Sequence, residues 1–531
     1  MARTHLKDAF RREIAQFRAK PMRPDKGVYA NIRRGGANRL QPKLCDYSRK
    51  GIFEMGSSMI RLYNTLTRKI ENFKPIRKGR VGLYTCGPTV YNFAHIGNLR
   101  TYIFEDILRR TLEYAGYRVR HVMNITDVGH LTSDADAGED KLEKGAAREG
   151  KTVWDIARFY TAAFLRDIKA LNIKRAEKLI PATSAIRSQL AIIKKLFDGG
   201  FAYETPEAVY FDVSKFRNYT KLSRQRLEEK KTGARAEVVE DPAKKHPQDF
   251  ALWFKRVGKF ANHAMHWPSP WGDGFPGWHI ECSAISSSTL GQPFDIHTGG
   301  VDHINVHHTN EIAQSEGAFK KPLARFWMHG EFLLVADSKM AKSAGTFLTL
   351  HELEKKEFDP LSYRYLILTS HYRSGINFTW ESLAGAEQSL ERLRGFIRSL
   401  LSARRLRAKG DKQKTLGKYK TEFENAVFDD LDTPKALSVF WSVMHAYNSD
   451  ASRFNPSAVL KLAYLFDTIL GLGLSNIKKI IPPADIKKLA AMRELCRQEK
   501  RWKEADEIRL KIEKAGFRVR DTETGPILEK I

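Results

Sequence analysis

The sequence predicts an α/β fold built on a doubly wound parallel sheet, followed by an α-helical bundle and a small C-terminal segment. An apolar run at 81–85, an amphipathic helical stripe and a second apolar run at 119–125 form a strand-helix-strand unit. Beyond about Asp359 the apolar periodicity is helical to the end. At 531 residues, 42% of them hydrophobic, the chain is too long for one core and fits roughly three domains.

The first strand-helix-strand unit marks where a ligand should bind. We expect a buried strand from Val81 to Thr85, which ends at Cys86, and a second from Val119 to Ile125. Gly116 stops the helix between them. Its buried stripe comprises Phe104, Ile107, Leu108, Thr111, Leu112 and Ala115. Parallel sheets of this kind bind ligands at the carboxyl ends of their strands, where Cys86 and Thr126 lie.

The rest of the chain is predicted more coarsely. Residues 151–223 are expected to be mainly helical, and residues 223–247 form a charge-rich surface excursion. Amphipathic helices are expected at 388–401 and 440–474, and a helix with a short strand-like end at 485–531. The stretch from 253 to 278 contains four tryptophans, Trp253, Trp267, Trp271 and Trp278, which either pack in the core or wall a small pocket.

Residues 1–58 differ from everything that follows. They contain 14 Lys or Arg against five Asp or Glu, with little periodicity, which predicts a basic, poorly ordered extension. An organelle transit peptide would contain fewer acidic residues, and a start codon assigned upstream of Met59 explains the segment equally well.

Bulk properties narrow the class of partner. The chain has 90 Lys and Arg against 62 Asp and Glu, a net charge of +28, which favours a polyanionic partner such as nucleic acid over a merely soluble basic protein. Only four cysteines occur, as expected of a reducing, cytoplasmic compartment. No uncharged apolar run reaches the ~18 residues that cross a bilayer, and we expect no membrane association.

Four scattered residues suggest a metal site: Cys86, Cys282, His307 and Glu311. Two thiols, an imidazole and a carboxylate suit tetrahedral Zn²⁺, and the spacing of His307 and Glu311 puts them on one face of a helix. Ligands drawn from distant segments indicate a metal in a cleft rather than a local structural finger. The alternative is two buried cysteines beside an ordinary histidine.

Two short motifs suggest phosphate binding. His95-Ile-Gly-Asn98 precedes the first helix, whose free N–H groups favour phosphate, although both polar residues could equally be helix caps. Farther along, Lys339-Met-Ala-Lys342-Ser lies in a loop of small residues. Its ammonium groups could neutralise charge on a triphosphate, or the loop could be an exposed basic turn.

The two motifs together resemble the HIGH and KMSKS signatures of class I aminoacyl-tRNA synthetases, which have a Rossmann-like catalytic domain. Three further motifs narrow the resemblance to cysteinyl-tRNA synthetases, over about residues 59–531. They are Cys86-Gly-Pro-Thr-Val-Tyr, Pro276-Gly-Trp-His-Ile-Glu-Cys-Ser and His307-His-Thr-Asn-Glu-Ile-Ala-Gln-Ser.

This resemblance implies that ATP activates L-cysteine to cysteinyl-adenylate, which is transferred to the terminal adenosine of tRNA(Cys). It maps the zinc ligands onto Cys86, Cys282, His307 and Glu311, with the metal selecting the substrate thiolate. It maps ATP binding and catalysis, with Mg²⁺, onto His95, Asn98, Lys339 and Lys342. The cysteine pocket maps onto Gly87, Thr126, Trp278, His297 and Asp302.

The same resemblance divides the chain and implies a monomer. Residues 59–358 would be the catalytic domain, residues 359–484 a helical bundle that contacts the tRNA stem, and residues 485–531 an anticodon-binding domain. Basic residues near the end are candidates for phosphate contacts, namely Arg497, Lys500, Arg501 and Lys503.

Two positions and one loop depart from the family pattern. Asn98 replaces the usual second histidine and cannot become cationic, and Ala341 replaces the serine of the lysine loop. We therefore expect slower or looser loop closure, with activity retained. The loop Gly299-Gly-Val-Asp-His-Ile-Asn-Val-His also differs from the usual wording, although the ligand positions are intact.

Two other functions fit part of the sequence. A ligase joining cysteine to an amino sugar would share the zinc and nucleotide motifs but would not need the C-terminal segment or the +28 charge. A non-catalytic protein that binds tRNA would not need Lys342 and His95.

Overall fold

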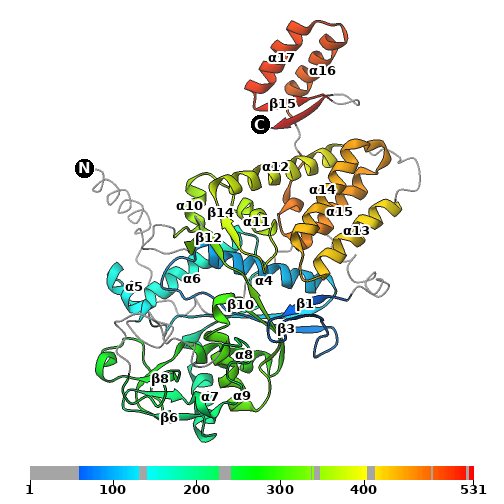
Figure 1. The fold of residues 1–531 in the computed structure, drawn as a ribbon. Coiled ribbons are helices and arrows are strands. Elements are labelled where there is room, and N and C mark those ends of the chain that lie inside the picture. Colours follow the sequence, from blue (N-terminus) through cyan, green and yellow to red (C-terminus); the bar gives the residue numbers. More distant parts are fainter. Residues whose placement is uncertain are drawn as a thin grey trace. The chain divides into compact units, whose positions relative to one another are not determined.

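The computed structural model describes residues 59–128, 131, 140–225, 241–335, 338–339, 347–403, 413–479, 482–521 and 526–530 (Figure 1). The predicted basic extension, residues 1–58, lies outside them.

The strands and helices follow the chain in a mixed order. The strands are β1 (Arg61–Asn64), β2 (Lys69–Asn72), β3 (Arg80–Thr85), β4 (Arg118–Ile125), β5 (Lys178–Pro181), β6 (Ala202–Glu204), β7 (Ala208–Phe211), β8 (Phe250–Lys255), β9 (Gly274–Pro276), β10 (Phe294–Gly300), β11 (Ala324–Gly330), β12 (Leu333–Val335), β13 (Ser338–Lys339), β14 (Ile376–Phe378), β15 (Phe517–Arg520) and β16 (Ile527–Lys530). The helices are α4 (Ile96–Tyr114), α5 (Lys141–Glu149), α6 (Val153–Ala170), α7 (Ile186–Asp198), α8 (Trp278–Leu290), α9 (His307–Phe319), α10 (Leu350–Lys355), α11 (Pro360–Leu368), α12 (Trp380–Ser402), α13 (Gln413–Phe428), α14 (Thr433–Ser449), α15 (Pro456–Leu470), α16 (Ala484–Gln498) and α17 (Trp502–Lys514).

A five-stranded parallel sheet in the order β11-β10-β3-β4-β5 forms the centre of the fold. Val81, Leu83 and Tyr84 of β3 are buried because helices cover both faces of the sheet. Figure 1 shows α4 on one side and α8 and α9 on the other. The predicted strand-helix-strand unit and the doubly wound sheet are confirmed, and Cys86 and Thr126 directly follow β3 and β4.

The expectation of mainly helical structure over residues 151–223 is wrong in part. Helices α6 and α7 are present, but β6 and β7 join β8 and β9 in an antiparallel sheet. All four residues of β7 are buried, and Phe211 stacks on Phe250 of β8 with ring centroids 5.0 Å apart. Burial against this sheet, which the local sequence does not reveal, decides the conformation of the segment.

The tryptophans in this region divide between core and pocket. Trp253 is fully buried in the core of the second sheet, and Trp267 and Trp271 pack beside that core. Trp278, at the start of α8, is the one that reaches the cavity described below.

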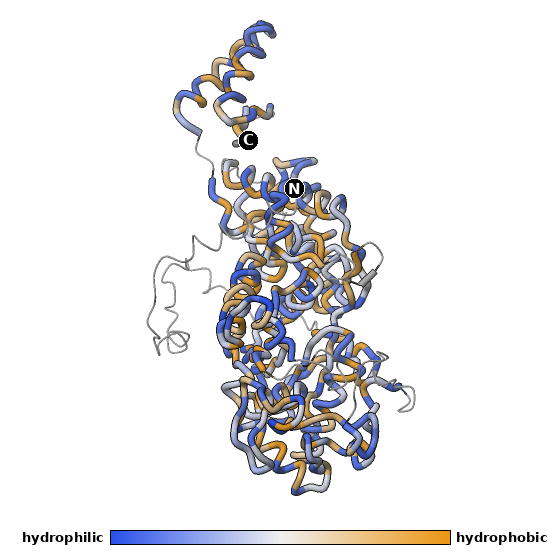
Figure 2. Tube along the Cα trace, turned by 90° about the vertical axis from the view of Figure 1, so that its left-hand side faces the viewer, coloured by the Kyte–Doolittle hydropathy of each residue, from blue (hydrophilic) through white to orange (hydrophobic). Residues whose placement is uncertain are grey.

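Residues after Asp359 are mostly helical, as predicted. The exceptions are β14, which pairs with β12, and the final hairpin of β15 and β16, which the sequence anticipated as a strand-like end. Hydrophobic and hydrophilic residues alternate along the helices near the C-terminus in Figure 2. The apolar residues of α16 and α17 form a small core with β15. In the described part of the chain, no helix combines the length and apolar character that crossing a bilayer requires.

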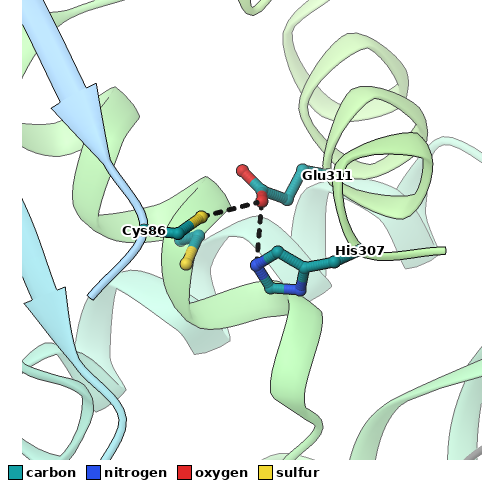
Figure 3. Close-up of side chains that lie close together, drawn as sticks. Cys86, His307 and Glu311 are labelled. Atoms are coloured by element: carbon teal, nitrogen blue, oxygen red, sulfur yellow. Dashed lines mark hydrogen bonds and ion pairs between the residues drawn. The ribbon is translucent and has the colours of Figure 1, made fainter. Parts of the chain in front are cut away.

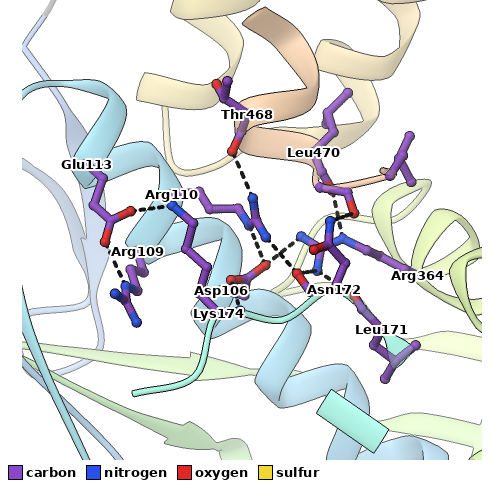
Figure 4. A network of polar contacts seen from close by, with 12 residues as sticks. Asp106, Arg109, Arg110, Glu113, Leu171, Asn172, Lys174, Arg364, Thr468 and Leu470 are labelled. Carbon is purple, nitrogen blue, oxygen red and sulfur yellow. Dashed lines mark hydrogen bonds and ion pairs between the residues drawn. The ribbon is translucent and has the colours of Figure 1, made fainter. Parts of the chain in front are cut away.

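A buried charge network, which we call the arginine hub, consists of Asp106, Arg110 and Arg364 (Figure 4). Asp106 of α4 accepts hydrogen bonds from both guanidinium groups at 2.7 Å. The arginines also donate to main-chain oxygens at the ends of α6 and α15, namely those of Leu171, Asn172, Thr468 and Leu470. Negative ends of two helix dipoles thus help to balance two cations. The hub fixes α4, whose first turn faces the cavity, against α11 and α15.

Candidate active site

A cavity of about 300 Å³ opens at the carboxyl edge of the parallel sheet. Its wall is formed by the loop from Cys86 to His95, the start of α4, and residues from β4, β10, α8 and α9. Of the residues proposed from sequence, the wall includes Cys86, Gly87, His95, Asn98, Thr126, Trp278, Asp302 and His307. The expected metal and phosphate sites therefore share one cavity.

The four predicted metal ligands meet at one end of this cavity. Cys86 follows β3, Cys282 lies on α8, and one turn of α9 carries His307 and Glu311. Their four donor atoms lie within 4.8 Å of one another, and all four residues are buried. Cys86, His307 and Glu311 point toward a common centre in Figure 3, with 3.0 Å between His307 Nε2 and Glu311 Oε1.

The donor set fits zinc in chemistry and in charge. Two sulfurs, one nitrogen and one carboxylate oxygen are accepted in tetrahedral sites. Burial raises the pKa of the Cys282 thiol, but its hydrogen bond with Cys86 and the nearby His307 outweigh burial and lower it to about 6. Burial also opposes ionisation of Glu311, yet His297 and His307 hold the pKa of its carboxyl well below the ordinary value. These two groups are thus ready to bind a cation. Burial raises the pKa of the Cys86 thiol, and Glu311 and Cys282 outweigh burial to raise the pKa of His307, so these two ligands would release a proton when a cation binds.

Further histidines surround the ligands. His297 Nε2 lies 2.7 Å from Glu311 Oε2, His308 Nε2 lies 3.3 Å from Cys86 Sγ, and His279 Nδ1 lies 2.9 Å from His307 Nδ1. Residues that hold the outer atoms of metal ligands fix their orientation. His297 thus lies behind Glu311, fully buried, and is not part of the cavity wall, where the sequence analysis expected it.

His279, His308 and His329 are not among the residues predicted from the sequence. His329 Nε2 lies 2.8 Å from His308 Nδ1. These residues come from α8, α9 and β11, which are adjacent only in the folded chain. The one local signal is the pair His307-His308, which directs two neighbouring imidazoles into the same buried region.

The other predicted pocket residues lie next to the ligands. Gly87 donates its N–H to Asn124 Oδ1 at 2.7 Å, and a Cβ there would lie 1.8 Å from the Asn124 carbonyl oxygen. Only glycine allows this close approach. Thr126 Oγ1 donates to Glu281. Trp278 stacks on the ligand His307 with ring centroids 4.3 Å apart. Together these residues wall the space beside the metal end.

His95 and Asn98 form the other end of the cavity and also cap α4. His95 Nδ1 accepts a hydrogen bond from the Asn98 N–H at 3.1 Å, and Asn98 Oδ1 accepts one from the His95 N–H at 3.2 Å. This is a reciprocal capping box. Burial lowers the pKa of His95 to about 4, so the ring is neutral near pH 7. Because Nδ1 is the acceptor, Nε2 carries the proton and is a hydrogen-bond donor.

The segment that carries the lysine loop is tied to this helix start. Before the loop, Lys339 of β13 pairs with Leu334 of β12. After it, the Ile96 N–H donates to the Leu348 carbonyl oxygen at 2.8 Å, and Thr349 forms a bridge with His95. Ala341 and Lys342 lie outside the described residues, and for Lys339 only the backbone is described. The segment after the loop is thus anchored to the first turn of α4, and the segment before it is anchored to β12.

Comparison with known proteins gives one family. Residues 72–388 match the family model described as tRNA synthetases class I (C) catalytic domain. A protein of Burkholderia lata named Cysteine--tRNA ligase 1 is 47% identical, over 87% of this chain and 95% of its own length. Cysteine--tRNA ligase of Treponema denticola is 43% identical, over 87% of this chain and 98% of its own length.

Solved structures resemble the chain in fold. Methionyl-tRNA synthetase of Mycobacterium tuberculosis, solved with methionyl-adenylate, aligns with a TM-score of 0.56 at 15% identity over 75% of this chain and 93% of its own. A leucyl enzyme of Agrobacterium radiobacter in a ternary complex with tRNA aligns with a TM-score of 0.55 at 12% identity, over 76% and 85% respectively. At such identities the likeness shows a shared fold.

Proposed function

The chain belongs to the class I cysteinyl-tRNA synthetase family, with cysteine–tRNA ligase activity, and we propose how its residues divide that reaction between the two ends of one cavity. At one end, Cys86, Cys282, His307 and Glu311 hold zinc and select the amino acid. At the other end, His95, Asn98, Lys339 and Lys342 bind ATP with Mg²⁺. The observation that carries this proposal is the single cavity whose wall runs from Cys86 to His95.

The metal end recognises the substrate side chain. Bound by these four residues, zinc would supply a soft acceptor for the thiolate of L-cysteine, for which the hydroxyl of serine is a poor substitute at neutral pH. Gly87 and Thr126 limit the space beside it, and the Trp278 indole covers the ligand His307. An apolar pocket alone discriminates by only ~1–3 kcal/mol, so the donor set accounts for selection without an editing domain.

The nucleotide end positions the reacting groups. A carboxylate oxygen of cysteine forms a bond to the α-phosphorus of ATP. The bond between that phosphorus and the oxygen that bridges it to the β-phosphorus breaks. Pyrophosphate leaves with the electron pair. His95 Nε2–H and the Gly97 N–H in the first turn of α4 donate hydrogen bonds to phosphate oxygens, and Lys339 and Lys342 balance the charge. The step needs no nucleophile from the chain.

Transfer to tRNA(Cys) completes the proposal. A net charge of +28 supports a polyanionic substrate and speaks against an amino-sugar acceptor. Lys500, Lys503 and Arg497 are candidates for phosphate contacts from the C-terminal segment. Two of the four basic residues predicted near the end are already engaged and are weaker candidates: Arg501 by Glu499 and Glu504 at 2.6 and 2.9 Å, and Arg497 by Asp521 at 3.2 Å. The domain division at residues 358 and 484, the monomeric state and the cytoplasmic location stay predictions.

Two assays test this function. Cysteine-dependent exchange of pyrophosphate into ATP measures activation alone, and charging of total tRNA measures transfer. We expect both. Exchange without charging would favour the amino-sugar ligase, and binding of tRNA without exchange would leave a non-catalytic protein.

A further inference from the structure

We propose that His303 is an additional substrate-contacting residue, whose Nε2–H donates a hydrogen bond to the α-phosphate where the cysteine carboxylate attacks. This inference rests on the proposed function and adds to it a residue to which that function gives no role. His303 belongs to the loop that departs from the usual family wording.

His303 forms part of the cavity wall between the two ends. It follows β10 in a short turn, and its side chain is 21% exposed. Its ring centroid lies 5.1 Å from that of the ligand His307 and 6.3 Å, edge-on, from that of Trp278. On its other side is Asp302, whose charge partly offsets the effect of burial on the pKa of His95. His303 therefore lies between the metal ligands and the phosphate-binding helix start.

The surroundings of the ring determine which nitrogen faces the substrate. A Cβ on Gly299 would lie 2.5 Å from His303 Nδ1, so this nitrogen is wedged against the end of β10. There Nδ1 is buried and finds no hydrogen-bond partner among the described residues. His303 Nε2 lies 3.9 Å from Asp302 Oδ2, and this carboxylate favours the proton on Nε2. The ring consequently presents an N–H donor on the cavity side.

The position of the His303 N–H indicates which substrate group it contacts. A cysteine whose sulfur is held at Cys86, Cys282 and His307 extends its carboxylate along the cavity toward His95. The carboxylate meets the α-phosphate between these two ends, which is the stretch of wall that His303 occupies. Charge develops on the phosphate oxygens during the attack, and a fixed donor there stabilises it. His303 also adds an imidazole to a cavity in which Asn98 replaces the second histidine that the family usually has at the helix start.

The test compares three variants of the zinc-loaded full chain. His303→Leu keeps the bulk of the side chain and removes both nitrogens, His303→Gln keeps an N–H donor, and His445→Leu removes an exposed histidine on α14 as the matched control. The measurements are zinc content, the Kd of L-cysteine, the Kd of the non-hydrolysable analogue cysteinyl-sulfamoyl-adenosine, and cysteine-dependent pyrophosphate exchange.

For His303→Leu we expect unchanged zinc content and an unchanged Kd for cysteine. The analogue should bind about 10-fold more weakly, and kcat for exchange should fall about 10-fold, as for loss of one hydrogen bond to a charged group. His303→Gln should recover most of both losses, and His445→Leu should match the wild type.

Three results would overturn the inference. Loss of zinc in His303→Leu would mean that the ring supports the metal ligands. An equal loss of affinity for cysteine alone would place the contact at the amino acid, and unchanged exchange would leave the ring without a role in activation. Absence of exchange in the wild type would instead contradict the proposed function itself, so the two failures are distinguishable.

Discussion

The metal end of the cavity is assembled from buried core positions, whereas the nucleotide end is assembled from a helix cap and a loop. Cys86, Cys282, His307 and Glu311 are at most 5% exposed and are backed by other histidines. At the opposite end, Asn98 is exposed and His95 is half-buried, and most of the lysine loop lies outside the described residues, between β13 and Thr349. Under the proposed function, selection of the amino acid would rest on core residues, and catalysis would rest on residues at the ends of helices and strands.

The largest expected effect comes from breaking the metal end. Cys282→Ser replaces a thiolate ligand by a hydroxyl, so we expect loss of bound zinc. Cysteine activation should fall at least ~1,000-fold, more than the 10–100-fold typical of losing a residue behind the ligands. Discrimination against serine should collapse as well. Metal analysis and pyrophosphate exchange with both amino acids check this, with Cys496→Ser, a buried cysteine of the C-terminal core, as the control. Unchanged zinc content and unchanged discrimination would contradict the assignment.

A second prediction separates the two ends. In the proposed function Lys342 acts on the phosphates of ATP, so Lys342→Ala should lower kcat for exchange about 100-fold. Zinc content and the Kd of L-cysteine should not change, because the metal end is formed by other elements. Lys355→Ala, an exposed lysine on α10, is the matched control. If Lys342→Ala also weakened binding of free cysteine, the two ends would not be independent.

The helix cap is expected to contribute less. Asn98→Ala removes the acceptor for the His95 N–H, which should cost about 1 kcal/mol of stability and slow exchange several-fold. Asn98→Gln can restore the reciprocal bond, because glutamine at this position completes a capping box. Thermal unfolding and exchange rates measure the two effects. Equal behaviour of Ala and Gln would show that the side chain acts on the phosphates and not through the cap.

The smallest effect on activity is expected at Glu105, which lies beneath the metal end and accepts a hydrogen bond from Thr298 at 2.8 Å. Burial raises the pKa of its carboxyl to about 8. The stability that this group contributes is fully present below pH 4.5 and is lost as the pH rises toward 8, by at most about 1.4 kcal/mol per pH unit. Glu105→Gln should keep this stability, so unfolding midpoints of variant and wild type should diverge between pH 5 and 8. Parallel curves would contradict the raised pKa.

The four candidate metal ligands and the helix start could be proposed from the sequence because short motifs contain the residue types that their chemistry requires. The two interpretations of His95 and Asn98, phosphate donors or caps, proved compatible, since one nitrogen of His95 caps α4 and the other remains free to donate. The histidines behind the ligands were not predictable, because β10, β11, α8 and α9 bring them together only in the fold. The same holds for β7, whose burial overrides local preference, and for Arg364, a fully buried cation that composition would place at the surface.

The arginine hub limits where the chain can be cut into fragments and where it can recombine with a homologous sequence. Asp106 and Arg110 precede residue 358, whereas Arg364 and the carbonyls of Thr468 and Leu470 follow it. A fragment that ended at residue 358 would keep Arg110 with the Asn172 carbonyl but without that of Thr468, and it would lose Arg364 altogether. Removing one member of a buried charge set costs several kcal/mol, so neither fragment should fold as it does in the whole chain. Recombination between homologues at this boundary would take Asp106 and Arg110 from one parent and Arg364 from the other. Only recombinants that keep all three charged residues should fold.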